Sequence, residues 1–205
     1  MKYCSQCGGR VSLKIPQGDD RQRHVCDECD SIHYQNPRII AGCLPTYKDK
    51  VLLCKRAIEP RYGLWTLPAG FMENGESTEQ GALRESWEEA RASIDLCGLY
   101  TMFSLPEISQ VYMLFRGELK DLNFAPGTES LEVELFREDE IPWDEMAFPV
   151  MWRTLQHYFA DLPKQNFPFR SETIYHSKLK QKEAQDYAAA FQNASSRVTS
   201  KAGSS

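Results

Sequence analysis

The sequence predicts an α/β or α+β sandwich that follows a small cysteine-rich module. Apolar segments typical of strands stand on both sides of one central helix, and a second helix closes the pattern. Elements in that order pack as layers around a shared core. Shifts in composition divide the chain into three expected parts, which are residues 1–36, residues 37–165 and a polar C-terminal extension over residues 166–205. In that extension KLKQKEAQDYAAAFQ has a weak helical pattern, and NASSRVTSKAGSS is typical of a disordered tail.

The overall composition is that of a soluble globular protein. The 205 residues are 41% hydrophobic and 26% charged, with a net charge of -5. Domains that bind nucleic acid are usually basic, so we expect no general nucleic-acid binding. No apolar run approaches the roughly 18–20 residues that span a bilayer, and MKYCSQCGG is not a secretory signal. We therefore expect a cytoplasmic protein without a membrane partner.

Two C-x-x-C pairs, separated by 18 residues, dominate the first part of the chain. They have the spacing of a zinc ribbon, in which four thiolates complete a tetrahedral site, so we expect a structural Zn²⁺. The alternative is two buried or redox-active pairs. His24 and His33 are surplus to a complete site, and we expect both on the surface. The expected zinc ligands are Cys4, Cys7, Cys26 and Cys29.

Five segments of the middle part have the apolar and β-branched composition of strands. The first two are joined by a Lys-Asp-Lys turn, and an irregular loop rich in Gly and Pro separates them from the central helix. The expected strands are Arg38–Tyr47, Val51–Arg56, Ile94–Phe103, Gln110–Leu119 and Leu131–Phe136.

The central helix is expected to begin at about Ser77, because Ser77 and Gln80 have the spacing of a capping box. A closing helix is expected over Met146–Leu162, where Pro149 is tolerable only in the first turn. Apolar residues at helical spacing form the expected buried face of the central helix, which consists of Leu83, Trp87, Ala90 and Ile94.

Three carboxylates share another face of the central helix. Glu85, Glu88 and Glu89 stand at i, i+3 and i+4, where like charges repel each other. A divalent cation would offset that repulsion, and hard oxygen ligands suit Mg²⁺ or Mn²⁺, which also bridge phosphates. A solvated acidic face is the alternative and is common. The three carboxylates alone do not decide between these interpretations.

The residues around the carboxylates resemble the Nudix box, G-x5-E-x7-R-E-U-x-E-E-x-G-U, where U is a bulky aliphatic residue. The matching residues, all in register, are Gly70, Glu76, Arg84, Glu85, Glu88 and Glu89. Ser86 stands where an aliphatic residue is usual, and Arg91 stands where the usual Gly would give an easy left-handed helix end. The resemblance to Nudix hydrolases implies a mixed sheet between helices as the fold of residues 37–165.

The same resemblance implies a role for the polar residues of the box. Glu85 and Glu89 would be the main ligands of a catalytic Mg²⁺ or Mn²⁺, and Glu88 would be a further ligand or a proton acceptor. Glu76 and Arg84 would form a structural ion pair. The metals would polarise a diphosphate and activate a water molecule that attacks phosphorus.

A second acidic stretch, PGTESLEVELF, carries Glu129 and Glu132. Many Nudix hydrolases have a further metal-binding or basic glutamate in this region. Glu132 is favoured as this fourth metal-binding and catalytic residue, because it lies four residues before Phe136 in an E-x-x-x-F pattern; Glu129 is the second choice. The alternative is an exposed strand edge on which acidic and apolar residues alternate.

Side chains around the loop of the box are candidates for substrate binding. Trp65 and Phe71 flank that loop and could stack on adenine or flavin, although an aromatic residue is more often part of a core. Arg56 could pair with diphosphate oxygens, and Arg61 is a second candidate that surface solvation explains equally well. Gly70 would let the loop backbone approach the metal or the phosphates.

A zinc ribbon ahead of a Nudix domain is similar to the NADH pyrophosphatases, but their S-Q-P-W-P-F-P-like run is missing from FSLPEISQVYMLF. Segments such as LCKRAIEPRYGLWTLPAGF instead resemble plant FAD pyrophosphatases, which also act on ADP-ribose. This resemblance covers roughly residues 3–165. It implies hydrolysis of FAD to FMN and AMP, or of ADP-ribose to AMP and ribose 5-phosphate.

Two other functions stay open. An NAD(H) pyrophosphatase or a hydrolase of NAD-capped RNA would use the same chemistry. A non-catalytic, nucleotide-sensing regulator would keep the fold without turnover, and the intact Glu85, Glu88 and Glu89 count against it. The expected partner is a small nucleotide substrate. A homodimer agrees with the resemblance, although the residues themselves do not indicate one.

Overall fold

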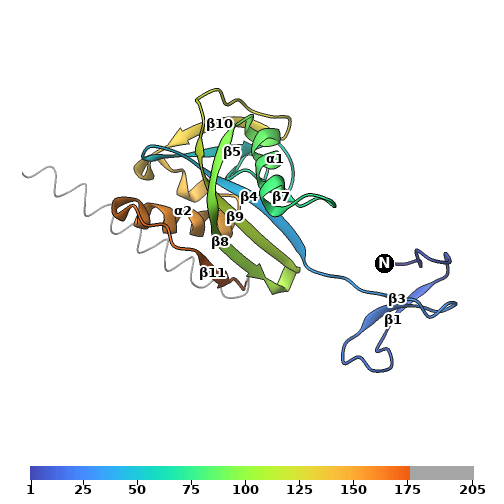
Figure 1. Cartoon of the computed structure of the whole chain (residues 1–205). Helices are drawn as coiled ribbons and strands as arrows, with labels where there is room; N and C mark the ends of the chain where they lie inside the picture. The colour runs from blue at the N-terminus through green and yellow to red at the C-terminus, as the bar shows by residue number, and fades with distance from the viewer. Residues whose placement is uncertain (176–205) are drawn as a thin grey trace, which may run out of the picture. The chain divides into compact units, whose positions relative to one another are not determined.

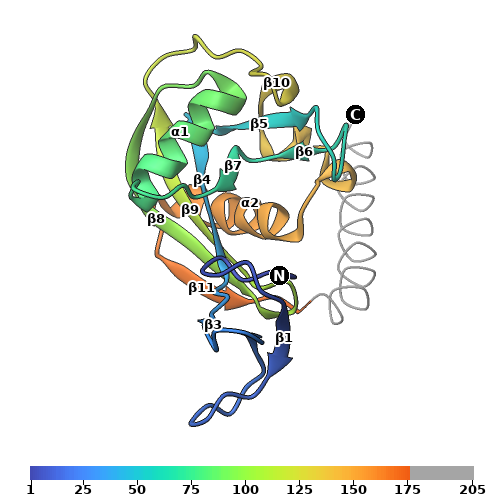
Figure 2. The same ribbon diagram turned by 90° about the vertical axis from the view of Figure 1, so that its right-hand side faces the viewer.

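The computed structural model describes residues 1–175, which form two compact units (Figures 1 and 2). The first unit is Met1–Pro37, and the second begins at Arg38. The helical pattern and the disordered tail expected after residue 175 lie outside the described residues. No helix in the described part of the chain is long and apolar enough to cross a membrane.

The first unit is a small antiparallel sheet. Its strands are β1 Val11–Lys14, β2 Arg23–Cys26 and β3 Ile32–His33, with β2 in the centre. A unit of this size buries little apolar surface, and such domains usually need a metal or disulfides for stability. Its buried apolar side chains are Cys4, Val25 and Cys26.

The second unit is built on one mixed sheet, which has eight strands in the described residues. These strands are β4 Arg38–Tyr47, β5 Lys50–Arg56, β6 Trp65–Thr66, β7 Ala69–Phe71, β8 Ile94–Leu105, β9 Gln110–Leu119, β10 Ser130–Phe136 and β11 Arg170–Thr173. Six of them follow the order β10-β5-β4-β9-β8-β11, and the short β6 and β7 pair with β5 and β4. The pairs β4–β9 and β8–β11 are parallel, and the others are antiparallel.

The helices α1 Thr78–Ala90 and α2 Pro149–Asp161 cover opposite faces of this sheet (Figure 1). Leu52 of β5 packs in the core cluster that contains α1 residues, whereas its neighbour Leu53 packs in the cluster that contains α2 residues. Consecutive strand residues point to opposite faces, so the sheet has a core on each side. The predicted sandwich of a mixed sheet between helices is confirmed. Short 3-10 turns lie at η1 Pro106–Ile108, η2 Glu138–Glu140, η3 Trp143–Glu145 and η4 Leu162–Lys164.

The predicted elements agree with the structure except near their ends. β8 extends two residues beyond its predicted end to Leu105, and β6 and β7 lie in the segment that we expected to be an irregular loop. The capping box of α1 is present, because Ser77 Oγ accepts from the Gln80 N–H at 3.2 Å and Gln80 Oε1 accepts from the Ser77 N–H at 2.8 Å. Pro149 occupies the first turn of α2, where its missing N–H costs nothing.

The prediction for the buried face of α1 was wrong in part. Leu83 and Trp87 are 37% and 51% exposed, and the helix instead buries a row of small residues that includes Ala82 and Ser86. The buried Ser86 hydroxyl donates to the Ala82 carbonyl at 2.7 Å, so its polarity is satisfied within the helix. Small residues let α1 approach the sheet closely, and the large apolar side chains therefore remain outside.

β11 lies in the part of the chain expected as a C-terminal extension, and it forms one edge of the sheet. Arg170 of β11 makes two contacts with the Asp161 carboxylate at the end of α2, at 2.7 and 2.8 Å. Asp161 also accepts from the Tyr100 hydroxyl of β8 at 2.7 Å. These contacts attach β11 to both α2 and β8.

Candidate active site

α1 lies so close to β7 that its glutamates reach the β7 backbone. A Cβ at Gly70 would overlap the Glu85 carboxylate, so a larger residue here would displace that carboxylate. The backbone N–H of Ala69 donates to Glu89 Oε2 at 3.2 Å. The buried small residues of α1 allow this approach, and the packing of the helix therefore fixes where these carboxylates lie.

The environment of these carboxylates disfavours negative charge. Glu89 is 6% exposed, and burial together with the charge of Glu85 raises the pKa of Glu89 to about 8. Burial also raises the pKa of Glu85, although hydrogen bonding from Arg84 opposes the shift. A bound cation would favour the ionised forms of both groups. A set of partly buried carboxylate oxygens fits a hard divalent cation.

Arg84 is the centre of an ion-pair network on the same helix. Its guanidinium contacts Glu76 at 2.8 Å, Glu85 at 2.7 Å and Glu88 at 3.0 Å, and it also donates to the Phe71 carbonyl at 3.2 Å. Hydrogen bonding from Arg84 lowers the pKa of Glu76 to about 2. Arg84 therefore ties the loop after β7 to the helix and pairs with three carboxylates of the box.

The structure brings Glu129, and not Glu132, to the carboxylates of the box. The charge of Glu129 acts on both Glu85 and Glu89, and Glu129 lines the same cleft. Glu132 does not line this cleft in the described structure, and its carboxylate pairs with Lys55 of the neighbouring β5 at 2.9 Å. The E-x-x-x-F spacing therefore pointed to a residue on the exposed edge strand.

The loop between β9 and β10 positions Glu129. The N–H groups of Ala125 and Gly127 donate to the carbonyls of Ala90 and Glu89, each at 2.9 Å, so the loop satisfies the C-terminal end of α1. A Cβ at Gly127 would overlap the backbone of α1. This glycine, two residues before the glutamate, was the signal in the sequence that could have favoured Glu129.

The carboxylates line a cleft of about 830 Å³. Apolar and aromatic side chains from several other elements line the same cleft. Such a cleft can hold a charged group beside the carboxylates and a flat ring against apolar side chains. The apolar lining consists of Ile40, Ile58, Phe71, Leu105, Ile108, Tyr112, Phe148, Val150 and Met151.

The side chains expected to bind substrate divide into two groups. Phe71 lines the cleft and is 49% exposed, with the guanidinium of Arg38 5.3 Å from its ring centroid. Arg56 also lines the cleft, and its Nε donates to the Pro60 carbonyl at 3.0 Å. Trp65, in contrast, is 5% exposed in the core, so the structure does not bring it to the cleft.

Two further arginines line the cleft. Arg61, which was the second candidate for phosphate binding, has a positive φ of 70°. Arg91 ends α1 in the left-handed region, with φ 52° and ψ 24°, even though the usual glycine is missing. The helix therefore ends in the left-handed conformation that is usual at this position of the box, although the residue is a cationic arginine and not a glycine.

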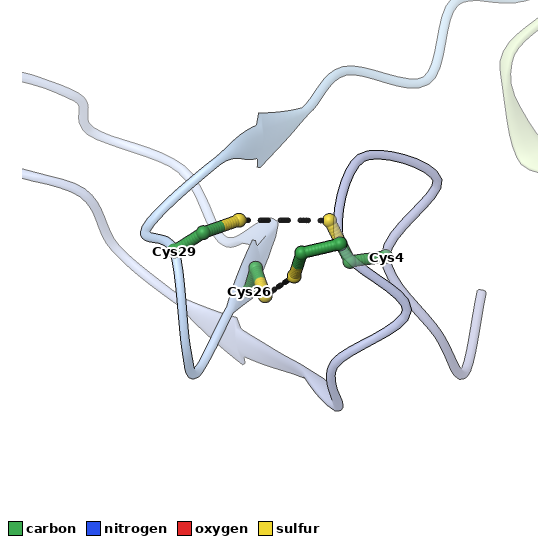
Figure 3. A group of neighbouring side chains, drawn as sticks. Cys4, Cys26 and Cys29 are labelled. Atoms are coloured by element: carbon green, nitrogen blue, oxygen red, sulfur yellow. Dashed lines mark hydrogen bonds between the residues drawn. The ribbon is translucent and has the colours of Figure 1, made fainter.

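The four paired cysteines of the first unit converge as expected (Figure 3). Their sulfur atoms lie within 4.8 Å of one another, with Cys4 Sγ 3.8 Å from Cys29 Sγ and Cys7 Sγ 3.4 Å from Cys26 Sγ. Four sulfurs around one Zn²⁺, each about 2.3 Å from the metal, would be about 3.8 Å apart. The cluster fits Zn²⁺. His33, expected on the surface, is instead half-buried with its Nε2 3.3 Å from Cys4 Sγ.

Two family models match the chain. Residues 2–35 match a model described as Nudix N-terminal, a zinc ribbon, and residues 36–158 match the NUDIX domain. A solved NUDIX hydrolase from Nitrosomonas europaea is 55% identical with a TM-score of 0.83, and the match covers 85% of this chain and 99% of that one.

Similar curated proteins carry three kinds of name. An NAD-capped RNA hydrolase NudC from Vibrio vulnificus is 31% identical over 69% of this chain and 53% of that protein. An ADP-ribose pyrophosphatase from Methanocaldococcus jannaschii is 31% identical over 69% of this chain and 80% of that protein. A plant relative, Nudix hydrolase 19 from Arabidopsis thaliana, is 33% identical over 43% of this chain and 20% of that protein. The chain spans about half the length, or less, of the NAD-capped RNA hydrolases that it matches.

Proposed function

The chain belongs to the Nudix family, and we propose that it hydrolyses the diphosphate of a small ADP-linked molecule, with ADP-ribose as the leading substrate. The main support is the lining of the cleft, which combines carboxylates with apolar and aromatic side chains. A nucleoside diphosphate derivative has the complementary pattern, because its charged diphosphate stands between groups that can stack or pack.

Glu85, Glu88, Glu89 and Glu129 would hold the catalytic cation, which we propose to be Mg²⁺ or Mn²⁺. Oxygen-only ligands suit both metals, and the donor set does not distinguish them. A divalent cation bound there supplies charge stabilisation for the diphosphate and a more acidic water molecule. Glu132 is not included, because its carboxylate is paired with Lys55 outside the cleft.

The residues of the chain orient the reacting groups. The Ala69 N–H donates to the Glu89 carboxylate, and the Arg84 guanidinium pairs with the Glu85 carboxylate. Arg56, which is buried and lines the cleft, is the proposed partner of the diphosphate oxygens. Glu88 is the proposed proton acceptor, since its side chain is 54% exposed and can meet water. The water oxygen bonds to one phosphorus, and the bond from that phosphorus to the bridging oxygen breaks. The bridging oxygen leaves with the other phosphate, and a proton of the water passes to the acceptor.

Each candidate ADP-linked substrate is supported by a different similarity. ADP-ribose is favoured by the relative from Methanocaldococcus jannaschii, whose match covers four fifths of that protein. NAD-capped RNA is the second candidate because several relatives carry that name, although each match covers about half of the relative or less. FAD rests on the resemblance to plant FAD pyrophosphatases alone.

The test is a panel of ADP-ribose, FAD, NADH, NAD⁺ and NAD-capped RNA, each assayed with Mg²⁺ and with Mn²⁺. We expect ADP-ribose to give the highest kcat/KM, with AMP and ribose 5-phosphate as products. The Glu89→Gln variant should lose at least about 100-fold in kcat while keeping its thermal midpoint, since even the outer partners of a metal site are worth 10–100-fold. Binding of these nucleotides without turnover by the wild-type protein would instead favour a nucleotide-sensing regulator.

A further inference from the structure

We propose that Arg91 binds a phosphoryl oxygen of the substrate and thereby contributes to substrate affinity. This inference rests on the proposed function, because it takes the cleft to be the site of a diphosphate. Three features of Arg91 support it: the conformation of its backbone, the position of its side chain and the lack of a carboxylate partner.

The backbone of Arg91 has a conformation that glycine adopts without steric cost. At φ 52° and ψ 24° the Cβ of any other residue is crowded by the following carbonyl. The helix end holds this turn, since the Arg91 N–H donates to the Trp87 carbonyl at 2.9 Å and the Ala92 N–H donates to the Ser86 carbonyl at 3.3 Å. A strained non-glycine residue at a cleft is a reason to look for a function of its side chain.

Arg91 lines the cleft that the proposed metal-binding carboxylates also line. Its guanidinium lies 5.7 Å from the ring centroid of Trp87, and Glu88 and Glu129 are among the other lining residues. Within residues 1–175 Arg91 forms no ion pair, whereas Arg84 pairs with three glutamates. The charge of Arg91 is therefore available to a bound anion.

A phosphoryl oxygen is the ligand that this charge fits. The wall of the cleft beside Arg91 is rich in carboxylates, so an anionic substrate needs fixed positive charge as well as a metal there. The positive charge of Arg56 is less available to an anion than that of Arg91. Arg56 is 9% exposed, donates to the Pro60 carbonyl and lies 5.2 Å from the ring centroid of Phe148. A planar guanidinium matches phosphate oxygens and can donate two hydrogen bonds at once.

The test compares three variants of the full-length protein in steady-state hydrolysis of ADP-ribose with Mg²⁺. Arg91→Gly removes the cation and restores the usual residue of the box, and Arg91→Lys keeps a charge without the planar fork. Lys48→Gly is the matched control, because Lys48 also has a left-handed φ of 57° and a cation over a neighbouring ring, Tyr47, but does not line the cleft.

We expect Arg91→Gly to raise KM about 10-fold or more, the loss that follows from one charge-assisted hydrogen bond, with kcat within about threefold of the wild type. Arg91→Lys should give an intermediate KM. Lys48→Gly should leave KM unchanged, and all three thermal midpoints should stay within about 3 °C of the wild type. An unchanged KM in Arg91→Gly, or an equal rise in Lys48→Gly, would overturn the role of Arg91. Absence of turnover by the wild-type protein would instead overturn the proposed function.

Discussion

Gly70 and Gly127 lie where two backbone segments approach α1 closely. The first is β7, which presents the Ala69 N–H to Glu89, and the second is the loop that carries Glu129 to the cleft. A side chain at Gly70 would displace the Glu85 carboxylate, and one at Gly127 would push the loop away from the helix backbone. The arrangement of the carboxylates thus depends on backbone packing as much as on the glutamates.

The carboxylates of the box that the structure brings together lie within one continuous segment. Glu85 and Glu89 belong to one helix, so spacing alone places them together. Glu129 and Trp65 depend on contacts between separate elements: Glu129 is carried by a loop that caps α1, and Trp65 packs edge-to-face against Phe136 at 4.9 Å in the core. The spacing of residues within one segment of the sequence does not predict contacts between separate elements.

Exchanging Glu129 or Glu132 for Gln separates the two candidates for the fourth carboxylate. Glu129→Gln should lower kcat/KM for ADP-ribose about 10–100-fold, because it removes a negative charge beside Glu85 and Glu89 where the cation would bind. Glu132→Gln, the matched control, should stay within about threefold of the wild type, since only its exposed pair with Lys55 is lost. A larger loss of kcat/KM in Glu132→Gln than in Glu129→Gln would instead identify Glu132 as the fourth metal-binding carboxylate.

At the scale of elements, the row of small residues on α1 explains both the exposed Trp87 and the buried Glu89. Ala82, Ser86 and Ala90 are fully buried and bring the helix axis near the sheet. Glu89 is thereby carried into the interior beside β7. The capping box predicted the start of α1 correctly. Helical periodicity assigned the buried face to the largest apolar residues, whereas the close approach of helix and sheet selects the smallest.

β11 shows why polar composition did not reveal an element of the sheet. Besides its backbone pairing with β8, it is attached by ion pairs. Arg170 pairs with Asp161, and Glu172 pairs with His157 at 2.6 Å and with Arg153 at 3.2 Å. Four residues without an apolar stripe have no pattern that predicts a strand. Only the partners on α2 and β8 make this segment part of the fold.

The Asp161 contacts should make the stability of the second unit sensitive to acid. Burial opposes ionisation of Asp161, but hydrogen bonds from Arg170 and Tyr100 outweigh it and lower its pKa below the usual 3.8. A lowered pKa means stability that is present above about pH 4 and is lost as the pH falls through the folded-state pKa. Asp161→Asn should therefore cost about 1–3 kcal/mol near pH 7 and much less near pH 2.

Urea unfolding followed by tryptophan fluorescence at several pH values measures this difference. His157 and Arg170 both act electrostatically on Asp161, so the salt concentration should be constant across the series. His157→Gln is a useful control, because it removes the other titrating group near Asp161 while leaving the Arg170 contacts in place. A constant difference between wild type and Asp161→Asn at every pH would contradict the prediction.

At the scale of the whole molecule, the two units obtain their stability in different ways. The second unit has apolar clusters on both faces of its sheet, and strand patterns with helix caps were enough to predict its architecture. The first unit has few buried apolar side chains, and its four clustered cysteines come from two separate segments. The spacing of the cysteine pairs predicted their convergence because tetrahedral coordination demands it.

Removal of zinc should therefore unfold the first unit and spare the second. The purified protein should contain about one zinc per chain, and a strong chelator should abolish amide protection in Met1–Pro37, because metal binding replaces the missing core there. Hydrogen exchange with mass spectrometry measures both units in one experiment, and protection of β4, β8 and β9 should persist. A Cys4→Ser, Cys7→Ser double variant should reproduce the chelated state. Folded, reduced protein without zinc, or full protection of the first unit after chelation, would contradict a structural zinc site.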